Sequence, residues 1–368
     1  MTDTVDTFPL DGVDYLEFWV GNARQSAYYY MRAFGFTPVA YRGPETGTRD
    51  RASYVLRQGG ITFVFSSALH PDHHINRFQS LHGDGVRDIA LLVPDARAAY
   101  ETAIARGARS VVEPFEESDE HGTIVRGAIH TYGDVIHTLI DRKNYDGVFL
   151  PGFERLELPE GGIGPGVGLK GVDHVVGNVE LGMMEHWVKF YEDVMGFTEM
   201  IHFTDDDIST EYSALMSKVI QAGDGRIKFP INEPAEGRRK SQIDEYLDFN
   251  HGPGAQHIAL ITDDIIGTVD KLSAEGVEFL RTPSTYYDMA VERVGHIEEK
   301  WEDLKRTGVL VDRDDEGYLL QIFTRPMQDR PTLFYEIIQR KGARGFGEGN
   351  FKALFESIER EQALRGNL

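Results

Sequence analysis

Two histidines and one glutamate could together bind a metal ion, because they lie at corresponding positions of an internal repeat. His174 ends the segment GVDH, His257 lies in QHIAL, and Glu336 lies in FYEII. Alternate residues of a strand share a face, so three neighbouring strands could bring these side chains together. Two neutral imidazoles and one carboxylate form the facial triad of non-haem Fe(II) oxygenases. Zinc uses the same ligand types, although the HExxH motif, which puts two zinc-binding histidines on one helix turn, is absent.

The repeat relates two halves of the chain. The matching segments, in the same order, are GVDY (12–15) with GVDH (171–174), GFT (35–37) with GFT (196–198), HGDGVRDIAL (82–91) with HGPGAQHIAL (251–260), and VIHTLIDRK (135–143) with LFYEIIQRK (333–341). At the three candidate ligand positions the first half instead carries Tyr15, Asp88 and Thr138. The pattern indicates a duplicated domain, of which only the second copy carries the candidate metal ligands.

The stretch 151–170 contains six glycines and three prolines, which is typical of a linker. It predicts an N-terminal domain at 1–150 without a metal and a C-terminal catalytic domain at 171–368. Strand patterns at 172–176 and 256–261 and helical patterns at 185–194 and 265–274 predict an α+β fold built on curved sheets. A final amphipathic helix is expected after Asn350, a candidate N-cap, with its apolar residues at i, i+3, i+4 and i+7.

Composition restricts the class of partner. The chain has 368 residues, a formal net charge of −22 and no cysteine. The acidity argues against a nucleic-acid partner, and the lack of cysteine excludes disulfides and thiolate ligands. Neither a membrane-spanning apolar run nor a secretory signal is recognisable. We therefore expect a soluble, cytoplasmic protein that acts on a small molecule.

Amides and aromatic residues surround the three candidate ligands in the sequence. Such a mixture suits a pocket that holds a flat ring and hydrogen-bonds a phenol or a carboxylate, although alternating phenylalanines are also typical of a core. The candidates are Asn232, Gln242, Gln256, Gln321, Phe323 and Phe334.

Eight ordered segments carry a family resemblance. They are GVDH (171–174), KFPINEP (228–234), KSQI (240–243), QHIAL (256–260), VLVDRDD (309–315), LQIFT (320–324), FYEIIQR (334–340) and GFGEGNF (345–351). Together they resemble the 4-hydroxyphenylpyruvate dioxygenase family of the vicinal oxygen chelate superfamily. The resemblance implies two duplicated domains, each an open curved barrel of paired βαβββ modules, and a C-terminal gating helix.

The resemblance also implies roles for residues. The Fe(II) ligands would be His174, His257 and Glu336. The substrate-binding residues would be Ser217, Asn232, Gln242, Gln256, Gln321, Phe323 and Phe334, and the gate would be formed by Phe346, Asn350 and Phe351. The implied reaction converts 4-hydroxyphenylpyruvate and O2 to homogentisate and CO2 in tyrosine and phenylalanine catabolism, without 2-oxoglutarate. A homodimer or homotetramer is expected, with no membrane partner.

Other functions remain open from the sequence. A 4-hydroxymandelate synthase has the same fold and triad and oxygenates the same substrate at its benzylic carbon. A non-catalytic binding module is a second alternative, which a test for bound iron would separate from an enzyme. An extradiol ring-cleaving dioxygenase shares the ligand types, but KFPINEP and GFGEGNF argue against it.

Overall fold

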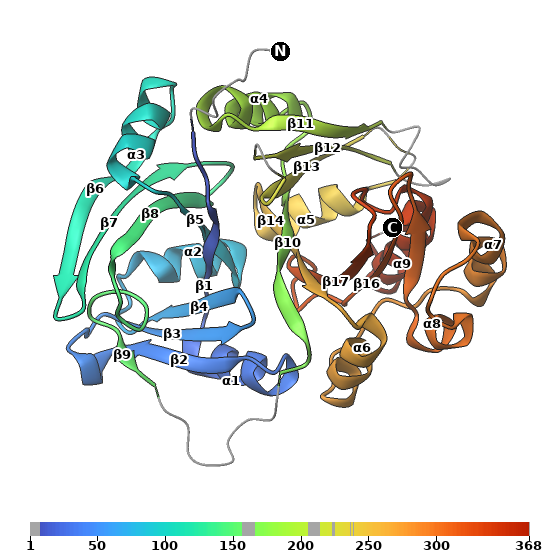
Figure 1. Ribbon diagram of the computed structural model, residues 1–368, viewed down its shortest axis with the longest axis horizontal. Coiled ribbons are helices and arrows are strands. Elements are labelled where there is room, and N and C mark those ends of the chain that lie inside the picture. Colours follow the sequence, from blue (N-terminus) through green and yellow to red (C-terminus); the bar gives the residue numbers. More distant parts are fainter. Residues whose placement is uncertain are drawn as a thin grey trace.

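The fold consists of two curled sheets with helices on their outer sides. The computed structural model describes residues 8–156, 166–204, 214–222, 225–235, 237 and 239–367. In Figure 1 the N-terminal half, coloured blue to green, lies beside the C-terminal half, coloured yellow to red. This arrangement confirms the expected α+β class and its duplication.

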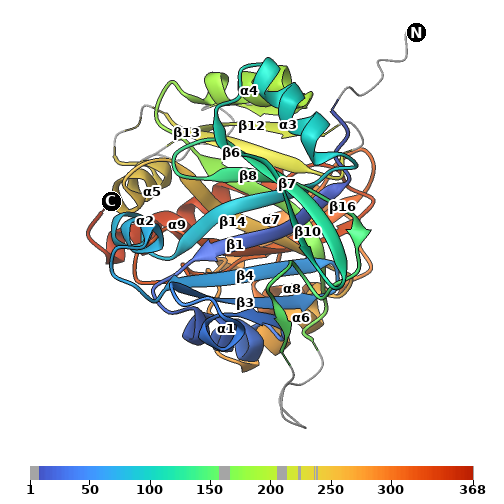
Figure 2. The ribbon, with the colours of Figure 1, turned by 90° about the vertical axis from the view of Figure 1, so that its left-hand side faces the viewer.

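The N-terminal half is built from two βαβββ modules. The first contains β1 (Gly12–Trp19), α1 (Ala23–Ala33), β2 (Thr37–Arg42), a 3-10 turn (Pro44–Thr46), β3 (Arg51–Gln58) and β4 (Ile61–Ala68). Helix α2 (His74–His82) leads to the second, which contains β5 (Gly85–Leu92), α3 (Ala96–Ala105), β6 (Ser110–Asp119), β7 (Gly122–His130) and β8 (Ile136–Tyr145). The short strand β9 (Glu154–Arg155) pairs with β2. Figure 2 shows this half facing the viewer, with α1 beside β3 and β4.

The C-terminal half repeats this plan with insertions. Its first module contains β10 (Leu169–Asn178), α4 (Met184–Met195), β11 (Thr198–Phe203), β12 (Leu215–Gln221) and β13 (Lys228–Pro234), followed by α5 (Gln242–Asn250). Its second contains β14 (Gly254–Thr262), α6 (Ile265–Ala274), α7 (Ser284–Val294), α8 (Trp301–Thr307), β15 (Leu310–Arg313), β16 (Tyr318–Phe323) and β17 (Phe334–Lys341). A 3-10 turn (Glu348–Asn350) then leads into α9 (Phe351–Leu364).

Strand order and register reveal the same duplication. The sheets have the orders β6-β7-β8-β5-β1-β4-β3-β2-β9 and β11-β12-β13-β10-β14-β17-β16-β15. In each, an antiparallel central pair, β1 with β5 or β10 with β14, is flanked by parallel neighbours. The pairing of Asp88 with Ile136 in the first half corresponds to the pairing of His257 with Phe334 in the second.

Most predicted elements form, and two details differ. The helical patterns become α4 and α6, and Gly196 ends α4 in the left-handed conformation (φ 68°). Asn350 precedes α9 as expected, but its side chain makes no capping hydrogen bond. Its Oδ1, the atom that would cap the helix, instead accepts a hydrogen bond from the hydroxyl of Tyr286 at 2.6 Å. Of the predicted linker, 157–165 lie outside the described residues, while Glu154 and Arg155 form β9.

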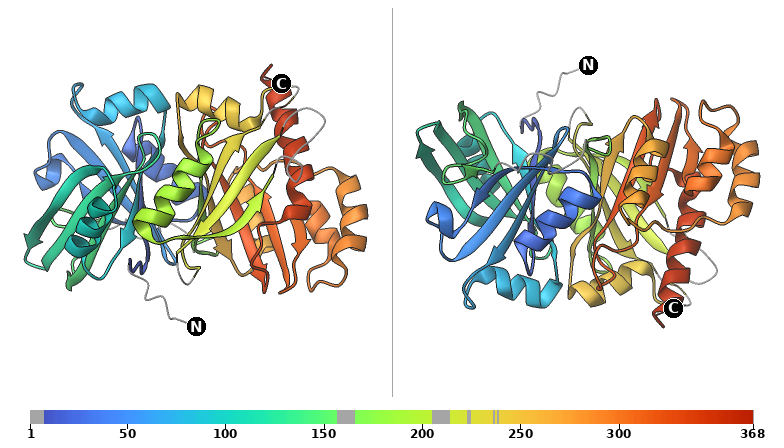
Figure 3. Two further views of the ribbon diagram at one scale, coloured as in Figure 1. Left: turned by 90° about the horizontal axis from the view of Figure 1, so that it is seen from above. Right: turned by 90° about the horizontal axis from the view of Figure 1, so that it is seen from below.

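The two halves share a continuous apolar core. The rings of Tyr30, Phe34 and Phe63 lie against Tyr335 of β17, and the hydroxyl of Tyr335 donates to that of Tyr30 at 2.9 Å. Views from above and below show the halves side by side along their length (Figure 3). Within the described ranges, no helix combines the length and the apolar character needed to span a bilayer.

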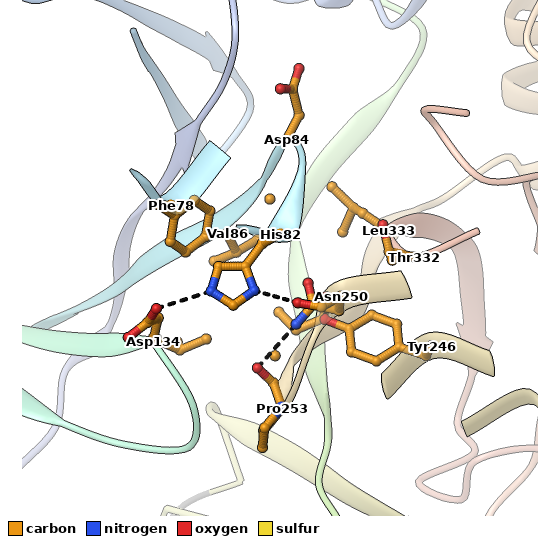
Figure 4. A pocket seen from close by; sticks show the side chains of 14 residues that line it. Phe78, His82, Asp84, Val86, Asp134, Tyr246, Asn250, Pro253, Thr332 and Leu333 are labelled. Carbon is orange, nitrogen blue, oxygen red and sulfur yellow. Dashed lines mark hydrogen bonds and ion pairs between the residues drawn. The ribbon is translucent and has the colours of Figure 1, made fainter. Parts of the chain in front are cut away.

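A buried histidine joins the halves beside this core. Figure 4 shows His82, the last residue of α2, between Asp134 and the end of α5. Its Nε2 lies 3.0 Å from Oδ2 of Asp134, and its Nδ1 lies 2.5 Å from the carbonyl oxygen of Asn250. The Asn250 amide then donates to the carbonyl of Pro253 at 3.1 Å. His82 therefore fixes the C-terminal end of α5 against the N-terminal half.

Replacing His82 by alanine should destabilise the protein. Losing two hydrogen bonds of a buried ring should lower the free energy of unfolding by about 2–3 kcal/mol. Urea unfolding followed by circular dichroism measures the change, with His121→Ala at an exposed histidine as control. Equal stability of the two variants would show that His82 does not join the halves.

Candidate metal centre

Three adjacent strands position the candidate ligands. In the strand register, His174 of β10 is opposite Ala259 of β14, which is in turn opposite Glu336 of β17. His257 lies two residues before Ala259 and so shares its face. The small side chain of Ala259 between His174 and Glu336 leaves room for the longer ones to meet. This convergence follows from sheet register between segments far apart in the sequence.

The three side chains form a compact buried group. Nε2 of His174 lies 3.1 Å, and Nε2 of His257 3.5 Å, from Oε2 of Glu336. One ligand atom of each residue lies within 4.8 Å of the others. Two atoms that each lie about 2.1 Å from one ion, at right angles, are about 3 Å apart. Among the described residues, this is the one group of three or more histidine, aspartate or glutamate side chains with such geometry.

Neighbouring residues orient both imidazoles. Nδ1 of His174 lies 2.8 Å from Oδ2 of Asp173, and Nδ1 of His257 lies 2.9 Å from Oε1 of Gln256. These oxygens would accept a hydrogen bond from the tautomer with its proton on Nδ1, and in that tautomer Nε2 of each ring is the nitrogen available to bind a metal beside Glu336. A hydrogen bond from the second nitrogen of a metal-binding histidine commonly fixes its tautomer in this way.

The electrostatics of the group fit a cation. Burial opposes charge on both imidazoles. It lowers the pKa of His257, whereas for His174 the carboxylates of Glu336 and Asp173 outweigh it and raise the pKa. Burial likewise opposes ionisation of Glu336, but the two histidines hold its pKa below the ordinary value. Its Oε1 is buried without a hydrogen-bond partner. A buried anion with an unsatisfied oxygen is costly unless a cation binds there.

The group opens into a cavity between the C-terminal sheet and α9. Of the residues expected to bind substrate or form the gate, those that line it are Ser217, Asn232, Gln242, Gln256, Phe323, Phe334, Phe346 and Phe351. The Phe334 ring stacks on His257 at 4.8 Å, and the Phe323 ring stands edge-on to His257 at 6.0 Å. The cavity wall thus combines aromatic rings packed against His257 with the amide and hydroxyl groups of Asn232, Gln242 and Ser217.

Gln321 and Asn350 lie beside the cavity wall and do not line it. Gln321 packs beneath the loop that precedes α9, where a Cβ on Gly347 (φ +79°) would lie 2.3 Å from Nε2 of Gln321. Asn350 bonds Tyr286 and Arg293 of α7. The family resemblance placed Gln321 among the substrate-binding residues and Asn350 in the gate, and both remain predictions.

Sequence reasoning also missed part of the wall. The additional lining residues are Val176, Phe203, Leu215, Val219, Pro230, Leu354, Phe355 and Ile358. Most are apolar, so their types alone did not distinguish them from core. The i, i+3, i+4, i+7 pattern after Asn350 was the available signal, since Phe351, Leu354, Phe355 and Ile358 all face the cavity.

Helix α9 closes the cavity on a firmly held connection. Oδ2 of Asp314 accepts from the backbone nitrogens of Arg344 and Gly345, both at 2.8 Å. Oδ2 of Asp312 accepts from the Gly349 nitrogen at 2.9 Å. In Figure 3, α9, in red, lies along the C-terminal half. The connection is therefore held by backbone hydrogen bonds at both of its ends.

The equivalent point of the N-terminal half is satisfied internally. Asp88 accepts from Thr138 Oγ1 at 2.6 Å, from the Thr138 nitrogen at 2.9 Å and from the Tyr15 hydroxyl at 3.2 Å. Burial raises the pKa of Asp88 to about 7. Nearby, Phe149 and Leu150 pack with Tyr15 in a separate apolar cluster. The duplicated positions therefore serve as a hydrogen-bonded core in this half.

Comparison with known proteins agrees with this geometry. A family profile described as "Hydroxyphenylpyruvate dioxygenase, HPPD, N-terminal" matches residues 6–150, and one described as "Glyoxalase/Bleomycin resistance protein/Dioxygenase superfamily" matches residues 171–322. The 4-hydroxyphenylpyruvate dioxygenase of Tetrahymena thermophila is 49% identical, over 97% of this chain and 91% of that protein. The chain belongs to the 4-hydroxyphenylpyruvate dioxygenase family. The family member of Yarrowia lipolytica is 46% identical, over 100% of this chain and 96% of its own length.

A solved structure supports the fold. A mutant of 4-hydroxymandelate synthase from Streptomyces coelicolor is 38% identical, covers 96% of this chain and 99% of its own, and has a TM-score of 0.86. The family relatives named above are more similar to this chain in sequence than this synthase is.

Removing any one candidate ligand should strongly weaken metal binding. His174→Ala, His257→Ala and Glu336→Ala each remove one of the three candidate ligands from a buried group. Binding of Co(II), followed by titration calorimetry on metal-free protein, should weaken by at least about 100-fold in each. Full retention of affinity in any one variant would remove that residue from the ligand set. His186→Ala, at a histidine outside the cavity wall, serves as control.

Metal affinity should fall as the pH is lowered. A histidine must be neutral to bind metal, and the raised pKa of His174 means that protons begin to compete above about pH 6.5. Below that pKa the affinity for Co(II) should fall by about tenfold per pH unit for each proton displaced. Calorimetry between about pH 8 and pH 5.5 tests this, and a constant affinity across the range would contradict it.

Proposed function

We propose that this protein converts 4-hydroxyphenylpyruvate and O2 to homogentisate and CO2, with Fe(II) held by His174, His257 and Glu336. The observation that carries the proposal is the buried triad opening onto a cavity lined by rings and amides. Membership of the family, with relatives of that name 49% and 46% identical over nearly the whole chain, supports it.

The donor set suits Fe(II). Two neutral imidazoles and one carboxylate leave open coordination positions on one side, as in other non-haem Fe(II) oxygenases. Bound there, Fe(II) would supply Lewis acidity toward the 2-oxo acid and redox chemistry toward O2. With a single protein carboxylate, the site keeps a net positive charge, which favours the anionic 2-oxo acid over neutral molecules of similar shape.

The cavity wall would hold the aromatic part of the substrate. Phe323 and Phe334 lie beside His257, with their ring centroids 6.3 Å apart at 71°. A flat ring bound against them would have its side chain directed to the triad. Ser217 and Asn232 are opposite each other on β12 and β13, and Gln242 begins α5. These groups would hydrogen-bond the phenol, so the contribution of this wall is positioning.

Helix α9 would exclude water during the reaction. Its apolar face forms one wall of the cavity, and the Phe351 ring meets the Phe203 ring edge-on at 4.9 Å. A closed apolar cover limits the access of water and stray reductants to the reacting atoms. Opening of this cover would admit substrate and release product.

Oxygenation at the benzylic carbon is the second candidate. It draws support from the structural similarity to a 4-hydroxymandelate synthase mutant, at 38% identity. The two reactions need the same triad and differ in how the ring lies relative to it. The greater similarity to 4-hydroxyphenylpyruvate dioxygenases favours ring hydroxylation with migration of the side chain.

Product identification tests the proposal directly. Purified protein with Fe(II), ascorbate, 4-hydroxyphenylpyruvate and air should yield homogentisate and one CO2 per substrate, measured by chromatography against standards. Glu336→Gln should yield neither. Formation of 4-hydroxymandelate would replace the main proposal with the second candidate, and the absence of both products from iron-loaded protein would reject this substrate.

A further inference from the structure

A closed ring of contacts surrounds the candidate ligand His174. Nε and Nη2 of Arg340 donate to the two carboxylate oxygens of Asp173, each at 2.8 Å, and Asp173 accepts from Nδ1 of His174. The His174 ring contacts the Phe346 ring at 4.9 Å, and the Arg340 guanidinium lies 5.5 Å from the centre of that same ring. Arg340, Asp173, His174 and Phe346 thus hold one another in place.

The same arginine also holds the connection to α9. Its Nη1 donates to the carbonyl oxygen of Gly345 at 2.7 Å. One planar group therefore bridges the carboxylate that orients a candidate metal ligand and the backbone where the covering helix begins. A guanidinium can make these directional contacts together because its donors are fixed in one plane.

The N-terminal half contains a similar cluster, with Asp14, Tyr15 and Arg142 at the positions that the repeat aligns with Asp173, His174 and Arg340 and with Phe149 as the nearby ring. Nε of Arg142 donates to both oxygens of Asp14 at 2.9 Å, and Nη1 donates to the carbonyl of Phe149. The Arg142 guanidinium lies 5.2 Å from the Phe149 ring, which meets Tyr15 edge-on at 5.4 Å. The antiparallel strand register shifts at Asp14 in β1 and at Asp173 in β10, so both aspartates lie at an irregularity of the sheet.

The two clusters differ in what they connect. In the first half the hydroxyl of Tyr15 donates a hydrogen bond to Asp88, and Phe149 packs within a buried apolar cluster. In the second half His174 replaces the tyrosine, so Asp173 hydrogen-bonds a candidate metal ligand. Phe346 lies in the segment that precedes α9. The duplicated cluster thus joins a candidate metal ligand to the segment that leads into the helix covering the cavity, and it does so in the second half only.

We propose that Arg340 is a positioning residue that couples metal occupancy at His174 to closure of the Gly345–Phe346 segment and of α9. The inference rests on the proposed metal centre. Metal binding would fix the position of His174. His174 in turn holds Asp173 and Phe346 in place, and these two residues hold Arg340 against the carbonyl of Gly345. Because coupling between two sites is reciprocal, closure of the segment also strengthens metal binding.

The test compares Arg340→Lys with its matched control Arg142→Lys. Lysine keeps the charge but cannot bridge a carboxylate and a carbonyl in one plane. Two quantities are measured on metal-free protein and after addition of Co(II): the affinity for Co(II), and hydrogen exchange of backbone amides in 343–351. Circular dichroism checks that each variant is folded.

In the parent protein, Co(II) should slow exchange in 343–351 by about fivefold or more. Arg340→Lys should bind Co(II) about tenfold or more weakly and lose this response even when saturated with metal, while Arg142→Lys keeps both. Phe346→Leu, with Phe149→Leu as its control, should also lose the exchange response. It provides a second test should Arg340→Lys fail to fold.

Three results would overturn the inference. The first is a parent protein that binds Co(II) with no change of exchange in 343–351. The second is an Arg340→Lys variant with parental affinity and response, and the third is equal losses in the Arg142→Lys control. The first two leave the metal centre intact, whereas a parent that binds no Co(II) would overturn the metal centre itself.

Discussion

The burial of one carboxylate beside two imidazoles is the constraint on which the C-terminal half depends. Glu336 is 3% exposed, and its Oε1 lacks a hydrogen-bond partner. Such an arrangement is costly unless a positive charge compensates the buried anion. The small Ala259 lies between the strands, an oxygen acceptor lies beside Nδ1 of each histidine, and a helix covers the cavity, so all three features surround this one group of candidate metal ligands.

Duplication allowed one half to keep structure and the other to acquire chemistry. Apart from the additional β9, both halves have the same strand order. Both also have a register shift at an aspartate that is hydrogen-bonded by an arginine, Asp14 with Arg142 and Asp173 with Arg340. At the three central positions the first half has groups that satisfy one another, with Asp88 as the shared acceptor. In the second half Oε1 of Glu336 is buried without a hydrogen-bond partner. The difference between core and active site is thus whether the polar groups are satisfied internally.

Sequence reasoning found the residues that come together because of their positions on strands. The triad was found because each ligand lies in a strand segment that the repeat aligns, and α9 was found from the spacing of its apolar residues. The surroundings of Gln321 and Asn350 were not predictable, because they depend on how the loop before α9 packs against β16 and α7. The contact between Arg340 and Asp173, 167 residues apart, depends on an irregular strand pairing that no local pattern indicates.

Binding of one iron ion by His174, His257 and Glu336 can be tested by anomalous diffraction at the iron absorption edge, from crystals of anaerobically Fe(II)-loaded protein. We expect a single strong peak within bonding distance, about 2.1 Å, of Nε2 of both histidines and an oxygen of Glu336. A peak elsewhere in the protein, or one that lacks any of these three ligands, would contradict it.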